Sequence, residues 1–565
     1  MILSSWILFV LAIQIIHFLG TWRLYKAAGY KGWYAAVPIY NAFILMKIIK
    51  RPSWWVLLLF IPTINLIVFG AIWIETLRSF GKNTIKDTFL GLASFGLYIY
   101  TINYSKKPSH IPNRDLRSKT GIGETLSSIL YAIVAATIVH NYIMQPYIIP
   151  TGSLEKSLLI GDFLFVSKFH YGARVPMTAV SFPMVHDTIP FLKIRSYLKN
   201  PQLPYLRLPA LQKIKRNDIV VFSWPADTVR QFFVREKRVD KPIDKKSNYV
   251  KRCLGIPGDT LEIINGFVHT NGVKNILPSR ARVQYTFNAF AQKGVSSRKL
   301  IAAGFEDFNR KYKIENITEN SYQKLIPHIV GRIGNTIEDF SVITKAKGLP
   351  PELIRQLGLR VSEVLETNKE LTLTINEANG LKSLEGIDSV KQRVLTSKTS
   401  NETFFPNKIP FNWNEDNFGP LLIPKKGMTI SLTRDNLPLY KKIIQDYENN
   451  TLEFTPTKIK INNKVETKYT FKKDYYWMMG DNRHRSEDSR FWGFVPEDHI
   501  VGKPVFIWFS IKGINDGIKN WSVRWNRVFT TVDGPGERYS YFPFFIGFVI
   551  IWQGFVYIRK RKLKK

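Results

Sequence analysis

The stretch that decides the fold reads Asn-Tyr-Val-Lys-Arg-Cys-Leu-Gly-Ile-Pro-Gly-Asp and occupies residues 248–259. It is a short apolar and aromatic run that ends at a Pro-Gly-Asp turn signal, which is typical of a β-strand followed by a tight turn. Lys251 stands among apolar neighbours in this run. Arg252 points to the opposite face of such a strand and needs an acidic partner. The stretch therefore predicts a strand that buries a lysine.

Similar runs recur on both sides of this stretch. They occupy residues 163–169, 218–224, 260–265, 475–479 and 503–510, and turn signals separate them. Short runs of branched and aromatic residues between turns predict a mainly β domain over residues 146–540. Two insertions interrupt it, namely the proline-rich segment 177–214 and the more charged segment 272–467, in which a helical portion is expected near residues 350–391.

Apolar segments surround the predicted β domain. Residues 2–19, 54–74, 125–144 and 541–558 are long and apolar enough to cross a bilayer, and a weaker candidate covers residues 88–102. About five transmembrane helices are therefore expected. Residues 1–122 would form an N-terminal membrane region with an interfacial segment at 33–46, residues 123–145 a helix that leads into the β domain, and residues 541–565 a last helix with a basic tail.

Basic residues near the apolar segments predict the orientation. Residues 23–51 hold six Lys or Arg, residues 106–119 hold five, and the tail after residue 558 holds six. Short loops rich in Lys and Arg face the cytoplasm. If these three regions do so, the whole β domain lies on the opposite, extracytoplasmic side.

The composition excludes some function classes. The 565 residues carry a net charge of +36, but they show no zinc-finger cysteines, no glycine-rich phosphate loop and no basic region joined to heptads. Anionic lipid is therefore the favoured partner of the basic surface, and no nucleic acid is expected. The single cysteine, Cys253, excludes an intramolecular disulfide and is expected to be a small buried core residue.

A serine directly after the third long apolar segment supplies a candidate nucleophile. Ser153 follows Thr151 and a glycine that lets the backbone approach a substrate closely. A serine hydroxyl needs a base to take its proton, and a lysine can serve only when it is neutral. Burial among apolar side chains lowers a lysine pKa, and Lys251 is positioned for that. A backbone N–H at Ser153 together with the Thr151 hydroxyl could bind an oxyanion.

A third segment, residues 479–497, is dense in polar residues yet bounded by aromatic runs, as expected for a buried hydrogen-bonding loop. With it, the chain resembles the type I signal peptidases, the membrane-bound leader peptidases of bacteria that use a serine and a lysine. The matching segments are residues 150–153, 159–162, 217–222, 251–259 and 480–490. Their order and their spacing from the apolar segment also fit that family.

The resemblance implies a role for each matching residue. Ser153 would be the nucleophile, Lys251 the general base, Ser486 the residue that orients the lysine amine, and Thr151 part of the oxyanion hole. Structural ion pairs would join Arg252 with Asp481 and Asp488 with Arg490. Substrate would add as a β-strand beside the site, against Tyr147, Ile149, Pro150, Leu154, Leu158, Asn248, Tyr249 and Val250.

The resemblance also implies a fold, a function and a location. We expect a mainly β catalytic domain of the signal-peptidase type with large insertions, anchored in the bacterial inner membrane as a multi-pass protein and facing the periplasm. It would cleave N-terminal signal peptides from exported preproteins, contact membrane lipids and associate with the translocation machinery. No cofactor and no catalytic metal are expected. The chain departs from the family at Leu154, where methionine is usual, and lacks a proline soon after it.

Other readings of the same residues are open. Ser153 and Lys156 match the S-x-x-K of penicillin-binding proteins and β-lactamases, and residues 119–121 spell their K-T-G, although here it precedes the serine. Ser486, His484 and Asp488 could be read as a triad, but they stand close together in one loop. An inactive scaffold with the same fold, and a self-cleaving repressor on a related fold, are the remaining alternatives.

Overall fold

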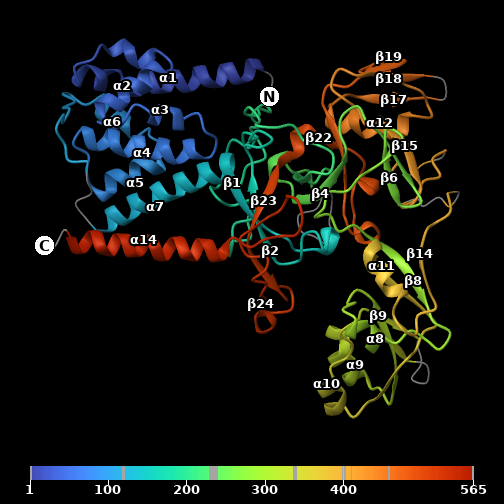
Figure 1. Cartoon of the computed structure of the whole chain (residues 1–565). Coiled ribbons are helices and arrows are strands. Elements are labelled where there is room, and N and C mark those ends of the chain that lie inside the picture. The colour runs from blue at the N-terminus through green and yellow to red at the C-terminus, as the bar shows by residue number, and fades with distance from the viewer. Residues whose placement is uncertain are drawn as a thin grey trace.

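The computed structural model describes residues 3–116, 121–227, 239–334, 340–397, 399, 403–406, 408, 410–455 and 458–562. A helical body holds the N-terminal residues, and a β-rich body holds most of the rest (Figure 1). The last helix extends from the β-rich body on the same side as the helix that enters it (Figure 1). The expectation of a mainly β fold outside the helical region is confirmed.

The helical body begins with one long helix and continues with shorter ones. Its elements are α1 (Leu3–Ala27), η1 (Gly32–Ala36), α2 (Tyr40–Ile48), α3 (Trp55–Leu58), α4 (Ile64–Ser79), α5 (Ile85–Ala93), α6 (Ile99–Asn103) and α7 (Gly121–Ile138). Helix α7 continues through η2 (Val139–Ile143) directly into the first strand, and α14 (Phe542–Lys562) closes the described chain.

The expected number of membrane helices is wrong. In the described part of the chain, three helices are long and apolar enough to cross a membrane, at Ile7–Ala27, Gly123–Ile143 and Phe542–Lys562. The segment 54–74 is divided between α3 and α4 because Pro62 cannot donate a hydrogen bond within a helix. The weaker segment 88–102 is divided between α5 and α6, where Gly96 has a φ of 84°. The three apolar helices indicate a membrane protein.

The β-rich body is built around a nine-stranded antiparallel sheet with the order β1-β2-β23-β3-β4-β21-β22, to which β24 and β25 add beside β23. Register shifts between β2 and β23 mark bulges, which bend and curl a sheet. The strands are β1 (Met144–Ile148), β2 (Asp162–Ser167), β3 (Ile219–Ser223), β4 (Asn248–Gly255), β21 (Tyr475–Met479), β22 (Val495–Pro496), β23 (Ile500–Lys512), β24 (Ser522–Val523) and β25 (Thr530–Thr531).

Both faces of this sheet are covered, as β3 illustrates. Its five residues are all buried, and successive side chains of a strand point to opposite faces. Ile219 and Val221 pack in one hydrophobic cluster with Leu154. Val220 packs in a second cluster with Cys253, which is fully buried as predicted. The nearly continuous apolar run of β3 is therefore explained by burial on two sides.

The two predicted insertions differ in secondary structure. Segment 177–214 forms only isolated bridges, among them Thr178 with Gln202 and Ser181 with Tyr197. Segment 272–467 contributes to several small sheets that lie away from the helical body (Figure 1). The expected helical portion at 350–391 is wrong in part, because strands separate its two short helices.

The small sheets and short helices have these bounds. One sheet joins β15 (Phe418–Leu422), β5 (Thr260–Ile264), β6 (Phe267–Thr270) and β7 (Val273–Lys274), and another joins β13 (Asn368–Thr374), β8 (Gln284–Phe290) and β14 (Ser389–Gln392). The others join β10 (Gly331–Ile333), β11 (Ser341–Lys345), β9 (Asn309–Glu315) and β12 (Arg360–Glu363); β16 (Thr429–Ser431) and β20 (Lys468–Thr470); and β17 (Leu452–Phe454), β18 (Ile459–Ile461) and β19 (Lys464–Val465). The helices are α8 (Ser297–Ala302), α9 (Glu319–Leu325), α10 (Pro351–Gln356), α11 (Ile375–Lys382), α12 (Leu437–Lys442) and α13 (Ser489–Trp492).

Candidate active site

Ser153 lies in a single 3-10 turn, η3 (Gly152–Leu154), which is separated from β1 by residues 149–151. The turn is fixed from below, because Leu154 is 1% exposed and packs in the hydrophobic cluster that also holds Ile149 and Leu158. It is fixed from the side by Asn482, whose backbone N–H donates to the Ser153 carbonyl at 3.1 Å and whose side-chain amide donates to the Gly152 carbonyl at 3.2 Å. The prediction from sequence missed Asn482, although it stands in the matched segment 480–490.

Lys251 reaches this serine from the middle of β4, where it is paired with Val220 of β3. Its Nζ donates to the Ser153 Oγ at 2.6 Å. The side chain passes over the ring of Tyr249, with Nζ 5.4 Å from the ring centre. The lysine residue is 3% exposed, so the predicted burial is observed. Strand pairing and apolar packing thus bring together two residues that are 98 positions apart.

The surroundings of Lys251 increase the fraction of neutral amine relative to an exposed lysine. Burial lowers the pKa of Lys251 to about 8, and the nearby carboxylates of Asp488 and Glu487 oppose part of this effect. Within the described residues, no carboxylate lies within ion-pair distance of the Lys251 amine. A buried amine that has a hydroxyl as its hydrogen-bond partner can accept the proton of that hydroxyl.

Two buried ion pairs hold the loop that covers the site. Arg252 donates from Nε and Nη2 to Asp481 at 2.7 and 2.6 Å. Arg490 donates from Nε and Nη2 to Asp488 at 2.9 Å each, and Asp488 also accepts the N–H of Gly480. All four charged residues are nearly inaccessible to solvent. In a bidentate pair two parallel hydrogen bonds hold the carboxylate and the guanidinium in one orientation. The carboxylates of Asp481 and Asp488 therefore restrain the backbone at Gly480.

Ser486 lies close to Ser153 but does not make the expected hydrogen bond to Lys251. Its Oγ is buried and has no hydrogen-bond partner among the described residues. It packs against Gly480, where an added Cβ would overlap the Ser486 hydroxyl and lie 2.6 Å from the Ser153 carbonyl oxygen. Gly480 is therefore needed for the close approach of the two serines, and the sequence alone did not single it out for that.

The expected oxyanion donors stand at the start of the turn. Thr151 is exposed, and its hydroxyl caps no backbone group of η3. Among the described residues, the backbone N–H of Ser153 has no hydrogen-bond acceptor. Both donors are therefore free to bind a developing negative charge.

A groove of about 1220 Å³ opens at Ser153 and Lys251. Of the predicted substrate residues, Pro150, Asn248, Tyr249 and Val250 line it. Ile149, Leu154 and Leu158 are instead buried in the cluster beneath it, and Tyr147 lines another cavity. The far wall of the groove comes from segment 272–467, through residues 304–309 and through Glu377 of α11. This second wall was not predicted from the sequence.

The alternative site readings find no support in the geometry. Lys156 donates to Glu377 at 2.5 Å and is not paired with Ser153, and two residues of the K-T-G, 119 and 120, lie outside the described residues. His484 accepts the N–H of Thr286 through Nδ1 and donates to Asp416 through Nε2, so both ring nitrogens are engaged away from Ser486.

The one group of side chains close enough to share a metal, among the described residues, is Glu415, Asp416 and His484. Besides His484, Asp416 accepts the backbone N–H of Leu395, and Glu415 accepts a guanidinium N–H of Arg393. These contacts account for the cluster as a structural link between segment 272–467 and the loop that carries Ser486.

The amino-acid sequence of the chain is similar to those of several known proteins. The proteins most like it include the signal peptidase I of Buchnera aphidicola subsp. Acyrthosiphon pisum, which is 23% identical over 412 residues, 73% of this chain and 82% of the relative. The signal peptidase I of Buchnera aphidicola subsp. Schizaphis graminum is 24% identical over 70% of this chain and 78% of its own length. That of Rickettsia typhi is 28% identical over 163 residues, 29% of this chain and 48% of the relative.

Two family descriptions match the chain. A family of unknown function (DUF5684) matches residues 33–112, within the helical body. The family described as signal peptidase, peptidase S26, matches residues 122–328 and 423–509, which include Ser153, Lys251 and Ser486 and make up more than half of the chain. The resemblance found in the sequence is confirmed, and the chain belongs to the signal peptidase family, peptidase S26.

Proposed function

We propose that this protein is a membrane-bound serine endopeptidase that removes N-terminal signal peptides from exported preproteins, with Ser153 as nucleophile and Lys251 as general base. The observation that carries the proposal is the 2.6 Å hydrogen bond between the Lys251 amine and the Ser153 hydroxyl. The burial of Lys251, which keeps much of the amine neutral near pH 8, supports the same roles.

The reaction follows from these two groups. Neutral Lys251 takes the proton of Ser153 as Oγ attacks the carbonyl carbon of the scissile peptide bond. The N–H of Ser153 and the Thr151 hydroxyl stabilise the oxyanion. The protonated lysine gives its proton to the leaving amine, and an ester to Ser153 remains. Water then loses a proton to Lys251 and attacks the ester. Lys251 returns that proton to the departing Ser153 Oγ, which restores the free serine and releases the cleaved signal peptide with a new carboxyl group.

Free backbone edges support the addition of substrate as a strand. Among the described strands, β1 pairs with β2 alone, so its other edge is open beside Tyr147 and Ile148. Strand β4 pairs with β21 only from Arg252 onward, which leaves the edge of Asn248–Lys251 open on that side. An extended peptide between these two edges would run past Ser153. Buried Ile149, Leu154 and Leu158 would then support the floor of the substrate pockets from below.

Ser486 and the ion pairs would act on the dyad indirectly. The Ser486 hydroxyl, which has no partner among the described residues, would turn toward the Lys251 amine when Ser153 gives up its proton. The pairs of Arg252 with Asp481 and of Arg490 with Asp488 would keep that loop in place.

The proposed location is the bacterial inner membrane, with the β-rich body on the periplasmic face. Helix α7 enters that body and α14 leaves it on the same side, so both ends of the body would meet one side of a membrane (Figure 1). The last turn of α14 carries Arg559, Lys560, Arg561 and Lys562, and basic flanks face the cytoplasm. Signal peptides, membrane lipids and the translocation machinery would be its partners, and the domain boundaries predicted from sequence are retained in this proposal.

The test is cleavage of a preprotein with an Ala-x-Ala site by the full-length protein in detergent. Wild type is expected to cut after the second alanine, and Ser153→Ala and Lys251→Ala are expected to be inactive while folded. Lys156→Ala serves as the matched lysine control and is expected to cut far faster than either dyad variant, since Lys156 is paired with Glu377. Normal cleavage by Lys251→Ala, or loss of all cleavage only in Lys156→Ala, would refute the assignment.

A further inference from the structure

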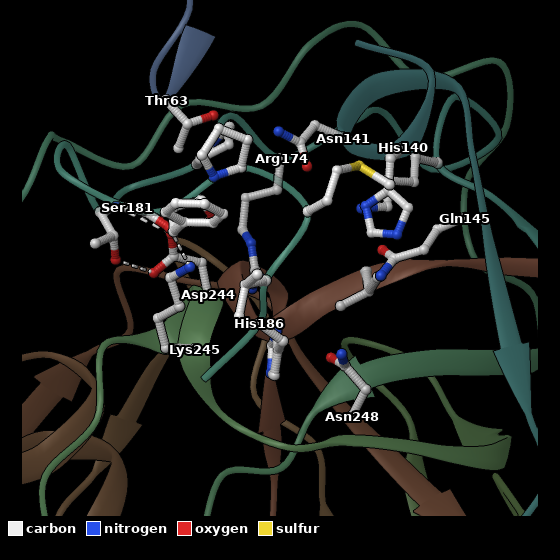
Figure 2. A pocket seen from close by; sticks show the side chains of 18 of the residues that line it. Thr63, His140, Asn141, Gln145, Arg174, Ser181, His186, Asp244, Lys245 and Asn248 are labelled. Carbon is white, nitrogen blue, oxygen red and sulfur yellow. Dashed lines mark hydrogen bonds between the residues drawn. The ribbon is translucent and has the colours of Figure 1, made fainter. Parts of the chain in front are cut away.

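A cavity of about 230 Å³ lies where α7 gives way to β1, separate from the catalytic groove (Figure 2). Its lining comes from η2 and β1, Lys168, the segment 174–186 and residues 244–248, together with Thr63 and Val501. We call it the interfacial cavity. Figure 2 shows the Arg174 side chain extending through it, with His140 and Asn141 on one side and Ser181 and Asp244 on the other.

The interfacial cavity gathers positive charge. Lys168, Arg174 and Lys245 line it, and the one carboxylate among its described lining residues is Asp244. Asp244 is already engaged, because it accepts the backbone N–H groups of Met177 and Thr178 and the hydroxyl of Thr178. No ion pair joins it to any of the three cations within the described structure.

The three cations have only neutral partners, or none, among the described residues. Arg174 donates to the Asp498 carbonyl at 2.8 Å and to the Ser223 hydroxyl at 3.2 Å. Lys245 donates to the Ser181 hydroxyl at 2.6 Å. The Lys168 amine makes no hydrogen bond and no ion pair there, and the backbone N–H of Lys168 donates to the Ile143 carbonyl at 3.0 Å. Hydroxyls and carbonyls do not neutralise a cation, and one carboxylate stands against three cations, so the cavity keeps a net positive charge.

The pKa values of the three cations are lowered in this arrangement. Burial lowers the pKa of Lys168 to about 7, and the neighbouring charge of Arg174 lowers it further. Burial also lowers the pKa of Arg174 and of Lys245, against the opposing effect of Asp244. A bound anion would reverse these effects, because an opposite charge favours the protonated form.

The surroundings of the interfacial cavity point to a membrane. His140 and Asn141 belong to the candidate membrane span Gly123–Ile143, and Thr63 belongs to the helical body. Phe182 and Met184, which also line the cavity, are 56% and 50% exposed. The same proline-rich segment exposes further large apolar side chains, namely Phe191, Leu192, Ile194 and Leu198. A charged pocket beside such an apolar rim matches a lipid headgroup beside its acyl chains.

We propose that the interfacial cavity binds the phosphate group of an anionic phospholipid. Arg and Lys side chains that lack an internal anion are the usual partners of phosphate oxygens, and Arg174 is central among them. The proposal rests on the membrane location of the proposed function. The bound headgroup would lie next to residues of the proposed substrate site, because Tyr147 and Asn248 line the cavity. Asn248 also lines the groove at Ser153, and it donates to the Tyr147 hydroxyl at 3.2 Å.

The test measures binding by calorimetry on full-length Ser153→Ala protein in a non-ionic detergent, so that its result is independent of cleavage. The probes are dihexanoyl phosphatidylglycerol and inorganic phosphate. Lys168→Gln removes a charge from the cavity without removing a hydrogen bond of the described structure. Lys193→Gln is the matched control, since Lys193 is exposed in the same proline-rich segment and does not line the cavity.

Dihexanoyl phosphatidylglycerol is expected to bind the parent protein. Its dissociation constant should be at least about tenfold higher for Lys168→Gln and within about twofold of the parent value for Lys193→Gln. Equal binding to the parent and to Lys168→Gln would overturn the proposal, as would equal losses in both variants. If inorganic phosphate binds as tightly and displaces the lipid, the ligand is free phosphate and the lipid assignment is wrong. Should Lys168→Gln melt below the parent protein, Lys245→Gln is judged by the same criteria.

Discussion

The pH dependence of cleavage is the most direct consequence of the burial of Lys251. Burial lowers its pKa from an ordinary 10.5 to about 8. At pH 7 roughly one molecule in ten would then carry the neutral amine, against about one in 3,000 for an unperturbed lysine, a difference worth about 3 kcal/mol. Since only the neutral amine can act as the base, kcat/KM should rise about tenfold from pH 6 to 7, about fivefold from pH 7 to 8, and level off by about pH 9.

The assay is cleavage of a signal-peptide substrate well below KM, in detergent at constant ionic strength, from about pH 5.5 to 10, with intrinsic fluorescence as a check that the protein stays folded. Lys156→Gln is the control and should keep the same inflection, because Lys156 pairs with Glu377 outside the dyad. An inflection above about pH 9.5, a flat profile, or an inflection that disappears in Lys156→Gln would refute the reasoning. Each of these results would mean that the titrating group is not a buried Lys251.

Three further predictions concern the structure around the dyad. Gly480→Ala should lower kcat/KM by roughly 100-fold, because its Cβ would overlap Ser486 and displace the nucleophile turn; unchanged kinetics would contradict this. Asp481→Asn leaves the buried guanidinium of Arg252 without its counter-charge and should destabilise the protein by about 3–5 kcal/mol in thermal or chemical unfolding. Lys251→Met should be inactive but more stable at pH 7 by up to about 3 kcal/mol, since the folded pKa of Lys251 lies below its unfolded value. The destabilisation of the folded protein by the buried charged amine is present in full below about pH 8 and vanishes above about pH 10.5. A lower Tm than wild type at pH 7 would exclude this prediction.

The sequence was sufficient for the parts of the fold that depend on local pattern. All six predicted strand runs appear as β2, β3, β4, β5, β21 and β23, since branched and aromatic residues between turn signals specify a strand locally. The association of Lys251 with Ser153 was also predicted, because a serine needs a base, burial among apolar residues lowers a lysine pKa, and the matching segments resemble those of a family that uses both residues. The partner of Arg252 followed from the alternation of the strand and from the family resemblance.

The features that the sequence did not reveal depend on single residues or on distant contacts. Average hydropathy does not register Pro62 or the turn at Gly96, which divide two apolar segments into helices too short to span a bilayer. The uncompensated charge of Lys168 is apparent only when its neighbours in space are known. The close packing of Gly480 against Ser153 joins residues that are far apart in the sequence.

The large insertion is the strongest case of long-range dependence, because strand β8 contacts both loops of the site. Gln284 donates its backbone N–H to the Asp481 carbonyl at 2.8 Å and its side-chain amide to the Glu155 carbonyl at 2.8 Å. The N–H of Thr286 donates to His484 at 3.0 Å, within the loop that carries Ser486. Each of these hydrogen bonds would leave a buried polar group unsatisfied if it were lost, at a cost of about 1–3 kcal/mol. The insertion is therefore part of the structure that positions the turn of Ser153 and the loop of Ser486, in addition to forming the far wall of the groove.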